Sequence, residues 1–205
     1  MIGFQENRNG SVRLLRRRSE RMATKKDVKE SRKEEPKQIN PQDLIERTLV
    51  LIKPDGVQRG LIGRIIQKFE DAGFKIVGAK MVWIDEKFGK RHYFDVAERR
   101  GENVLKVLLD FITAGPVMAL CIEGVSAIEN ARKIVGSTEP KSALPGTIRG
   151  DFAHHSYAYT DGKNTAVKNL IHASGKLEEA KYEIALWFSP QELHTYKIAH
   201  EMLVF

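Results

Sequence analysis

The stretch NLIHASGK places one histidine, His172, where an apolar run gives way to a small-residue turn, and a helical pattern begins directly after it. A neutral imidazole has a pKa close to 7, so near that pH it can act as a nucleophile. A lone histidine at such a junction more often packs against the core or caps a helix. His172 therefore predicts catalysis only if other parts of the chain supply chemical partners for it.

Three cationic side chains and one hydroxyl are candidates for those partners. Lys53 closes the apolar run TLVLI, so its amino group must either reach solvent or face an anion. Arg132, Thr138 and Arg149 come from a helical segment and a long polar loop. Taken one at a time, each cation also fits an ordinary surface charge. If the four converge on His172, the forked guanidinium groups of the arginines and the point charge of the lysine suit phosphoryl oxygens. The chain has no GxxxxGK[ST] loop, so side chains would have to hold the phosphates.

Glu183 is the candidate for orienting the imidazole. It lies on the helical segment that follows His172, beside the apolar stripe of that helix rather than opposite it. A carboxylate in that position could face inward and fix the orientation of the histidine ring. A surface glutamate that pairs with a neighbouring cation is the alternative, and the pattern leaves both open.

The apolar periodicity predicts the elements that would bring these groups together. Strands are expected near residues 47–53, 74–84, 115–124 and 165–173, and helices near 61–69, 86–97, 102–112, 126–136 and 176–188. Pro54, Asp55 and Gly56 predict a turn after the first strand. Two β-α-β units side by side predict an α+β, ferredoxin-like split βαβ fold, a four-stranded antiparallel sheet with helices on one face. The polar stretch from 136 to about 165 is expected to be a long functional loop.

Charge and composition separate a tail from a domain. Residues 1–40 hold 12 of the 34 Lys and Arg residues and 6 of the 27 Asp and Glu residues, so most of the net charge of +7 belongs to the tail. Few large apolar residues occur there, and we expect residues 1–43 to be a basic, disordered extension, with Met22 as an alternative start. Residues 44–205 are expected to form one catalytic domain. The single cysteine, Cys121, fits a reducing compartment, and no apolar run predicts a membrane span.

From residue 46 to about 196 the chain resembles the nucleoside diphosphate kinases. The resemblance is carried by RTLVLIKPDGVQRGLIGRIIQKFEDAGF, RHYFDV, GPVMAL, STEPKSALPGTIRGDF, NLIHAS and EIALWFSPQEL, in this order. It implies a ferredoxin-like core in a hexamer or tetramer, located in the cytoplasm. It also implies transfer of the γ-phosphoryl group of a nucleoside triphosphate, mainly ATP, to nucleoside diphosphates by a ping-pong route, which maintains the nucleoside triphosphate pools. Mg²⁺ would be held through the nucleotide's phosphates, with no direct protein ligand.

The resemblance also implies roles for individual residues. His172 matches the nucleophile that forms a phosphohistidine, and Glu183 matches the glutamate that positions it. The groups that match the surroundings of the phosphates are Lys53, Tyr93, Arg132, Thr138 and Arg149. Asn169 matches the asparagine near the sugar and the transferred phosphate, and Leu108 matches an apolar wall beside the base.

The chain departs from the family pattern at three places. A gapless count places Val104 where the family usually has an aromatic residue that stacks on the base. Gly175 replaces the acidic residue near the metal and the start of the following helix. Residues 153–168 contain about ten residues more than the commoner members, which could lengthen a hairpin at the rim of the site. Tyr157 or Tyr159 from this insertion could cover the base in place of Val104.

Two other classes of function are weighed against the kinase. A regulatory module that binds nucleotides without catalysis would fit the lost aromatic and the lost acidic residue, but it leaves His172, Lys53 and Arg149 unexplained. A nucleic-acid-binding protein is supported only by the basic tail, because the remaining chain is nearly neutral. We therefore expect nucleotides as partners, no membrane, and nucleic acid at most weakly through the tail.

Overall fold

The computed structural model describes residues 40–199 and 201–204. The expected basic extension falls mainly on residues 1–39, which lie outside the described residues. The first described element is a short 3₁₀ helix, Pro41–Leu44, whose N-terminal Asn40 side chain accepts a hydrogen bond from the Gln42 amide. None of the helices within the described part of the chain is long and apolar enough to cross a membrane.

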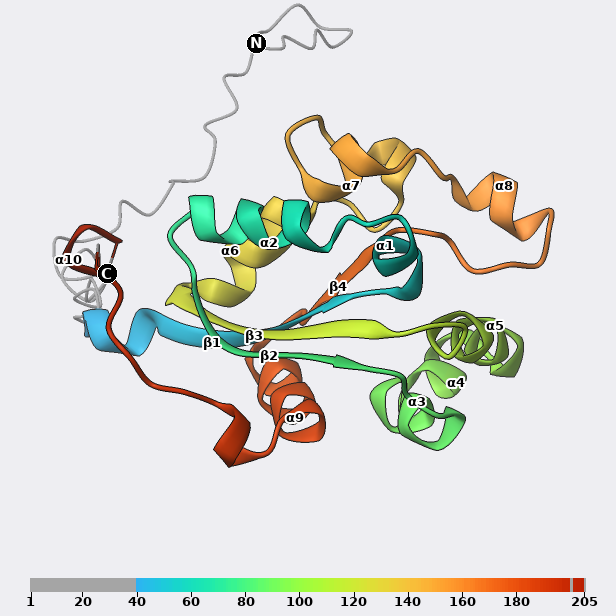
Figure 1. Ribbon diagram of the computed structural model, residues 1–205. Helices are drawn as coiled ribbons and strands as arrows, with labels where there is room; N and C mark the ends of the chain where they lie inside the picture. The colour runs from blue at the N-terminus through green and yellow to red at the C-terminus, as the bar shows by residue number, and fades with distance from the viewer. Residues whose placement is uncertain (1–39, 200, 205) are drawn as a thin grey trace, which may run out of the picture. The chain divides into compact units, whose positions relative to one another are not determined.

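Four antiparallel strands form one sheet in the order β2-β3-β1-β4 (Figure 1). The strands are β1 (Ile45–Ile52), β2 (Lys75–Val82), β3 (Val117–Val125) and β4 (Ile171–Ala173). The central strands β1 and β3 pair over their whole length, from Ile45 opposite Val125 to Ile52 opposite Met118. This order is that of the ferredoxin-like split βαβ fold, so the expected fold class is confirmed.

Helices cover both faces of the sheet, so the expectation that they lie on one face is wrong. The helices are α1 (Pro54–Gln58), α2 (Ile62–Asp71), α3 (Glu86–His92), α4 (Val96–Arg100), α5 (Glu102–Ile112), α6 (Ala127–Val135), α7 (Ile148–Phe152), α8 (Tyr157–Asp161), α9 (Leu177–Trp187) and α10 (Glu201–Val204). Figure 1 shows α2 and α6 above the sheet and α9 and α3 below it.

The sequence of β1 explains this two-sided cover. Successive side chains of a strand point to opposite faces. Val50 and Ile52 pack in the core beneath α2 and α6, whereas Leu49 and Leu51 pack in the second core with Trp187 of α9. All four strand residues have no exposed surface. Because both faces of β1 are apolar, each face needs a helical layer to exclude water.

Three local expectations differ from the structure. The last strand is much shorter than 165–173, because Leu170 has a φ of +69° and turns the chain away from the extended path. The turn at Pro54 continues into the short helix α1, for which proline is well suited at the first position. The expected break at Gly78 is confirmed as an irregularity of register between Ile76 and Gly78.

The long polar stretch contains regular structure. It holds a 3₁₀ helix at Pro140–Ser142 and the helices α7 and α8. The inserted residues form α8 and the chain that leads to β4, so the expectation of a lengthened hairpin is wrong. The side chain of Ser156 accepts a hydrogen bond from the Tyr159 amide and caps α8, which favours a helix over a strand at this point.

Candidate active site

A cavity of about 420 Å³ lies between β4, α3 to α5, α8 and α9, and it gathers most of the predicted site residues. The predicted residues that line it are Lys53, Tyr93, Val104, Leu108, Thr138, Asn169, His172 and Glu183. Arg132 and Arg149 are not among the lining residues. The residues that do line it come from the sheet's end and from both neighbouring helical layers, which explains how positions far apart in sequence meet.

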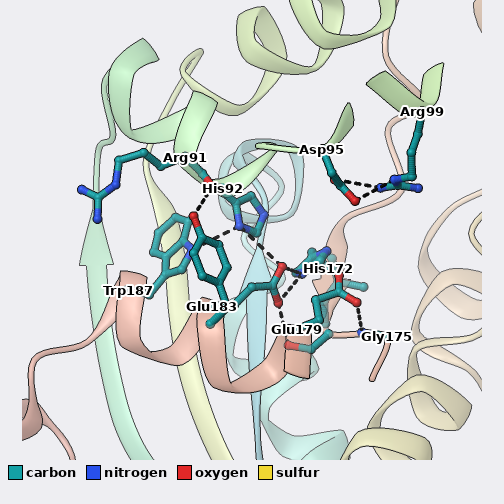
Figure 2. Close-up of polar contacts among 12 residues, drawn as sticks. Arg91, His92, Asp95, Arg99, His172, Gly175, Glu179, Glu183 and Trp187 are labelled. Carbon is teal, nitrogen blue, oxygen red and sulfur yellow. Dashed lines mark hydrogen bonds and ion pairs between the residues drawn. The ribbon is translucent and has the colours of Figure 1, made fainter. Parts of the chain in front are cut away.

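His172 is held by a buried carboxylate. Glu183 is 3% exposed, and its two oxygens lie 2.8 and 3.0 Å from Nε2 of His172 (Figure 2). Ser174 donates its hydroxyl hydrogen to Oε2 of Glu183 over 2.6 Å. This carboxylate fixes the tautomer with hydrogen on Nε2. The lone pair of Nδ1 is then the one left for attack on an electrophile.

His92 forms the buried wall behind His172. Their rings meet edge to face with centroids 4.9 Å apart, and the indole N–H of Trp187 donates to Nδ1 of His92 over 3.3 Å. Burial lowers the pKa of His92 well below its usual range, and the neighbouring His172 and Lys53 lower it further. His92 is therefore a neutral ring, and its 3.6 Å contact with Glu183 is a packing contact, not an ion pair.

Lys53 stands at the junction of β1 and α1 with its amino group inside the molecule. The amino group donates to Oδ1 of Asn169 over 2.9 Å, and the residue is 8% exposed. Burial, and then the charge of the nearby Arg149, lower the pKa of Lys53 to about 8, although the negative charge of Asp55 acts in the opposite direction. A buried ammonium next to an open cavity is costly when alone and is stabilised by an anion.

Arg149 binds backbone carbonyls next to the site and does not line the cavity. Its guanidinium donates to the backbone carbonyls of Asn169 at 3.1 Å, Gly136 at 3.0 Å and Ile171 at 2.6 Å. Burial lowers the pKa of Arg149 to about 10, so it keeps its charge at neutral pH. Arg132 is exposed on α6, and a Cβ added to Gly175 would lie 3.7 Å from its Nη1. Arg132 thus stands at the rim near the start of α9.

Tyr93 and Thr138, which both carry hydroxyl groups, line the cavity. The Tyr93 hydroxyl is buried and has no hydrogen-bond partner within the described chain. Burial raises the pKa of Tyr93, and the negative charge of Glu183 raises it further, so the phenol stays protonated. A buried donor without a partner is costly, and a ligand oxygen in the cavity could satisfy it.

The far end of the cavity is more open and is built from α5 and the insertion. Val104 on α5 is 37% exposed and Leu108 is partly buried. Opposite α5 the insertion contributes Tyr157, Thr160 and further lining residues up to Val167. Tyr159 does not line the cavity within the described residues; its hydroxyl accepts a hydrogen bond from Lys163. Of the two tyrosines considered for covering a base, only Tyr157 is in place.

Gly175, where the resemblance implies an acidic residue, has the acidic side chain of Glu179 beside it in the folded chain. The carboxylate of Glu179 accepts a hydrogen bond from the Gly175 amide over 2.8 Å and also lines the cavity (Figure 2). A carboxylate in the first turn of α9 complements the unsatisfied amides at the start of a helix. Asp95 lines the cavity as well and is paired with Arg99 at 2.7 Å.

Sequence reasoning missed several residues of this site, including His92, Ser174, Asp95 and Glu179, and one residue beside it, Asp55. His92, Ser174 and Asp55 carry no distinguishing local pattern, since each sits in a short segment whose inward direction depends on packing. The adjacency of His92 to Tyr93 and the HxS spacing of Ser174 were the available signals. Asp55 lies in a Pro-Asp-Gly stretch that predicts only a turn.

The sequence matches one protein family over most of its length. The family model described as nucleoside diphosphate kinase matches residues 46–193. The chain belongs to the nucleoside diphosphate kinase family. It is therefore an enzyme, a phosphotransferase, and its activity is phosphate transfer between nucleotides.

Relatives and solved structures of this family agree with the match. A nucleoside diphosphate kinase of Borreliella burgdorferi is 47% identical over 156 residues, which are 75% of this chain and 93% of the relative. One from Pyrococcus horikoshii is 50% identical over 151 residues, 74% of this chain and 90% of the relative. The solved transition-state mimic of the Borrelia burgdorferi kinase, with bound vanadate and ADP, has a TM-score of 0.77 at 45% identity and covers 79% of this chain and 98% of its own.

A second solved structure extends the comparison to another organism. The halophilic nucleoside diphosphate kinase of Halobacterium salinarum, in complex with CDP, has a TM-score of 0.67 at 40% identity, and the match covers 78% of this chain and 98% of its own. Similarity of this extent supports a common fold and a common class of reaction across the matched region.

Proposed function

We propose that the chain transfers the γ-phosphoryl group of a nucleoside triphosphate, mainly ATP, to nucleoside diphosphates through a phosphohistidine at His172. Such an enzyme maintains the cell's nucleoside triphosphate pools. The observation that carries the proposal is the pair of contacts from Glu183 to Nε2 of His172, at 2.8 and 3.0 Å. These contacts leave Nδ1 with a free lone pair that can face the cavity.

In the first half-reaction, Nδ1 of His172 attacks the γ-phosphorus, and the bond from that phosphorus to the bridging oxygen breaks. The diphosphate leaves with the electron pair, and the imidazole carries the phosphoryl group. Glu183 stabilises the positive charge that develops on the ring. A second diphosphate then attacks the phosphohistidine, which gives ping-pong kinetics because one site serves donor and acceptor in turn.

The remaining side chains bind and orient the phosphates. Phosphoryl transfer has a transition state with charge spread over its oxygens, so positioned cations and donors do most of the catalytic work. Lys53 supplies the buried cation, and the unpartnered Tyr93 hydroxyl supplies a donor. Asn169 and Thr138 line the same region of the cavity. In this proposal Arg149 acts partly through the backbone it holds.

The nucleotide would extend from the phosphates toward the open end of the cavity. Val104 and Leu108 offer the base an apolar surface, and Arg132 stands at the rim near Gly175. Few side chains in this part of α5 could form hydrogen bonds with base edges. An apolar surface of this kind fits an enzyme that accepts several nucleotides.

Mg²⁺ fits the site as an ion held through the nucleotide's phosphates. The carboxylates of Asp95 and Glu179 line the cavity near His172, and oxygen groups of this kind suit the waters of a magnesium ion. When bound, the ion neutralises charge on the phosphates. No side chain is assigned to it as a direct ligand.

Assembly and location complete the proposal. We infer a homo-oligomer, a hexamer or a tetramer, and a cytoplasmic location with no membrane association. The edge strand β2 leaves Met81 55% exposed and Trp83, just beyond its end, 67% exposed, which supports a further interface. The basic residues 1–43 would form an extension to the catalytic domain 44–205, with at most weak affinity for nucleic acid.

Labelled phosphate tests the mechanism directly. Incubation with γ-labelled ATP should label the protein, and the label should be lost in acid and kept in base, as phosphohistidine is acid-labile. Addition of unlabelled GDP should then move the label to GTP. Absence of label, or a label stable in acid, would contradict the phosphohistidine route.

A further inference from the structure

The backbone just before His172 makes a tight, left-handed turn at Leu170. The amide of Ile171 donates to the carbonyl of Asn169 over 2.8 Å, and Leu170 between them has a φ of +69°. A three-residue turn with positive φ is rare and strained in L-residues. Leu170 has no exposed surface, and no glycine relieves the turn. Strain of this kind persists only where the surroundings enforce it.

Two neighbouring residues support this turn through three hydrogen bonds. The backbone amide of Lys53 donates to the Leu170 carbonyl over 2.8 Å. Arg149 donates to the carbonyls on either side, those of Asn169 and Ile171. These three contacts satisfy the carbonyl oxygens of the turn. They leave the amide of Leu170, which needs an acceptor.

That acceptor is the carboxylate of Asp55. Its Oδ2 accepts the hydrogen bond from the Leu170 amide over 3.0 Å, and Asp55 is 6% exposed. Without this carboxylate the amide would be a buried donor with no partner, which favours rotation of the turn toward ordinary negative φ. Asp55 belongs to α1 by sequence, but this contact reaches across to the segment that precedes β4.

The turn lies between two residues of the proposed site, Asn169 before it and His172 after it. Asn169 accepts the hydrogen bond from the Lys53 amino group, and His172 follows two residues after Leu170. Rotation of Leu170 would therefore move both the amide beside the lysine and the strand that carries the imidazole.

We propose that Asp55 is a positioning residue, which holds the left-handed turn at Leu170 and through it the places of Asn169 and His172. The inference rests on the proposed role of His172 as the nucleophile. Asp55 does not line the cavity, so its effect on His172 passes through the backbone of the turn. Its negative charge also raises the pKa of Lys53, and this electrostatic effect has to be separated from the hydrogen bond.

Two substitutions separate the hydrogen bond from the charge. Asp55→Asn keeps an oxygen that can accept from the Leu170 amide but removes the negative charge near Lys53. Asp55→Ala removes both. Asp71→Ala, an exposed acidic residue at the end of α2, is the matched control. The full chain is used throughout, with single-turnover phosphorylation by ATP, steady-state kcat and KM, and thermal unfolding as measurements.

Asp55→Asn should phosphorylate within about threefold of the natural chain, because the turn survives. Asp55→Ala should be slower by about thirtyfold or more, with kcat falling much more than KM rises, since misplacement of reacting groups by about 1 Å can cost two orders of magnitude. A crystal structure of Asp55→Ala should show Leu170 at negative φ and the contact between Lys53 and Asn169 lost. The conservative rescue separates positioning from mere folding.

Several outcomes would overturn the inference. The first is an Asp55→Ala protein with a normal phosphorylation rate. The second is an Asp55→Asn protein that is phosphorylated more than tenfold more slowly than the natural chain although its turn is intact. The third is a slow Asp55→Ala protein in which Leu170 keeps its positive φ. If Asp55→Ala does not fold, the Asp55→Asn rate and structure alone decide. Failure of the natural chain to become phosphorylated would contradict the proposed function instead. The φ of Leu170 in the variants would still test whether Asp55 holds the left-handed turn.

Discussion

The lining side chains at the two ends of the cavity differ in burial and in the number of hydrogen bonds that fix them. At the end near β4, Glu183 is 3% exposed and bonds to both His172 and Ser174, and Lys53 is fixed by Asn169. At the end near α5 and α8, Val104 is 37% exposed and Tyr157 is 39% exposed. The side chains at the first end are tied into hydrogen-bond networks, whereas those at the second offer mainly surface.

This difference follows from what each end has to do. Phosphoryl transfer depends on distances and on charges placed in advance, so small displacements are costly. A base needs contact area, which many side chains can supply. The open end can therefore tolerate different side chains, whereas the closed end depends on the placement of its histidine, glutamate and lysine.

The largest expected effect is the loss of the nucleophile. His172→Ala should abolish both labelling of the protein by γ-labelled ATP and phosphate exchange between nucleotides. The fold should persist, because His172 is only partly buried and a substitution of this kind rarely unfolds a domain. His154→Ala, an exposed histidine of the insertion, is the control and should stay active. Turnover by the His172→Ala protein would rule out the mechanism.

The next effect concerns the cations of the closed end. Lys53→Met should slow phosphoryl transfer by about two orders of magnitude or more, as for other groups that stabilise charge in the transition state. Arg149→Met should slow it similarly and should also lower the free energy of unfolding by about 1–3 kcal/mol, because buried carbonyls lose their donor. Rapid-quench kinetics and thermal melts measure the two effects.

Lys163→Met on the insertion serves as the matched control for both cation variants, since its amino group bonds only to Tyr159 among the contacts described. Near-normal transfer rates in Lys53→Met and Arg149→Met would show that these cations do not serve the chemistry. A rate loss in Arg149→Met without loss of stability would place its guanidinium on the phosphates directly.

A smaller effect is expected at the open end. Val104→Phe should tighten binding of ADP and GDP by about tenfold, equivalent to about 1.4 kcal/mol, because it restores a ring for stacking. Pyrimidines should gain less, and the chemical step should be nearly unchanged, since the base interacts equally in ground and transition states. Isothermal titration measures the affinities.

Tyr157→Ala tests the alternative for the same end, because Tyr157 lines the cavity opposite α5. The substitution should change purine affinity little if the nucleotide base lies against Val104. Weaker purine binding in Tyr157→Ala, together with no gain in Val104→Phe, would move the base onto the insertion. Tyr159→Ala, which does not touch the cavity, is the control.

The smallest effect is a dependence of affinity on pH. Because burial lowers the pKa of Lys53 to about 8, the empty site loses the lysine's proton above that pH. Phosphates favour the protonated form, so binding then takes up a proton, and the dissociation constant should rise by at most tenfold per pH unit above 8. Below 8 this group should contribute no slope.

Titrations of ADP between pH 7 and 9.5, in buffers with different ionisation enthalpies, measure the affinity and the proton uptake together. Lys53→Arg should remove this slope, because a guanidinium keeps its charge throughout the range. A flat dissociation constant for the natural chain would show that Lys53 stays charged in the empty site.

Much of the fold was predictable from the sequence. The ferredoxin-like class follows from the apolar run before Lys53, the periodic pattern after Gly175 and the polar stretch between 136 and 165. These signals are useful because the spacing of apolar residues along a strand or helix can be seen in the sequence without any knowledge of tertiary contacts. The same reasoning placed His172 at the junction of a strand and a helix and Glu183 beside the apolar stripe of that helix, where it left the direction of the carboxylate open. Those inferences needed only local pattern and the resemblance to a family.

Other features depended on contacts that no local pattern encodes. The direction of the His92 side chain and the positive φ of Leu170 follow from how segments pack. The resemblance implies that Arg149 is a phosphate ligand, yet in the folded chain its guanidinium binds three carbonyls. Those carbonyls belong to Gly136, Asn169 and Ile171, which only the tertiary structure brings together.

The sequence by itself determined which chemical groups the protein owns: an imidazole, a carboxylate eleven positions later and a lysine at the end of an apolar strand. Only the tertiary structure decided how they are aimed. Leu170 adopts a left-handed conformation that its own side chain disfavours, and it does so because Asp55, 115 residues earlier in the chain, accepts its amide hydrogen. Local preference yields there because a buried amide without a partner is costly and the acceptor is supplied from a distant segment.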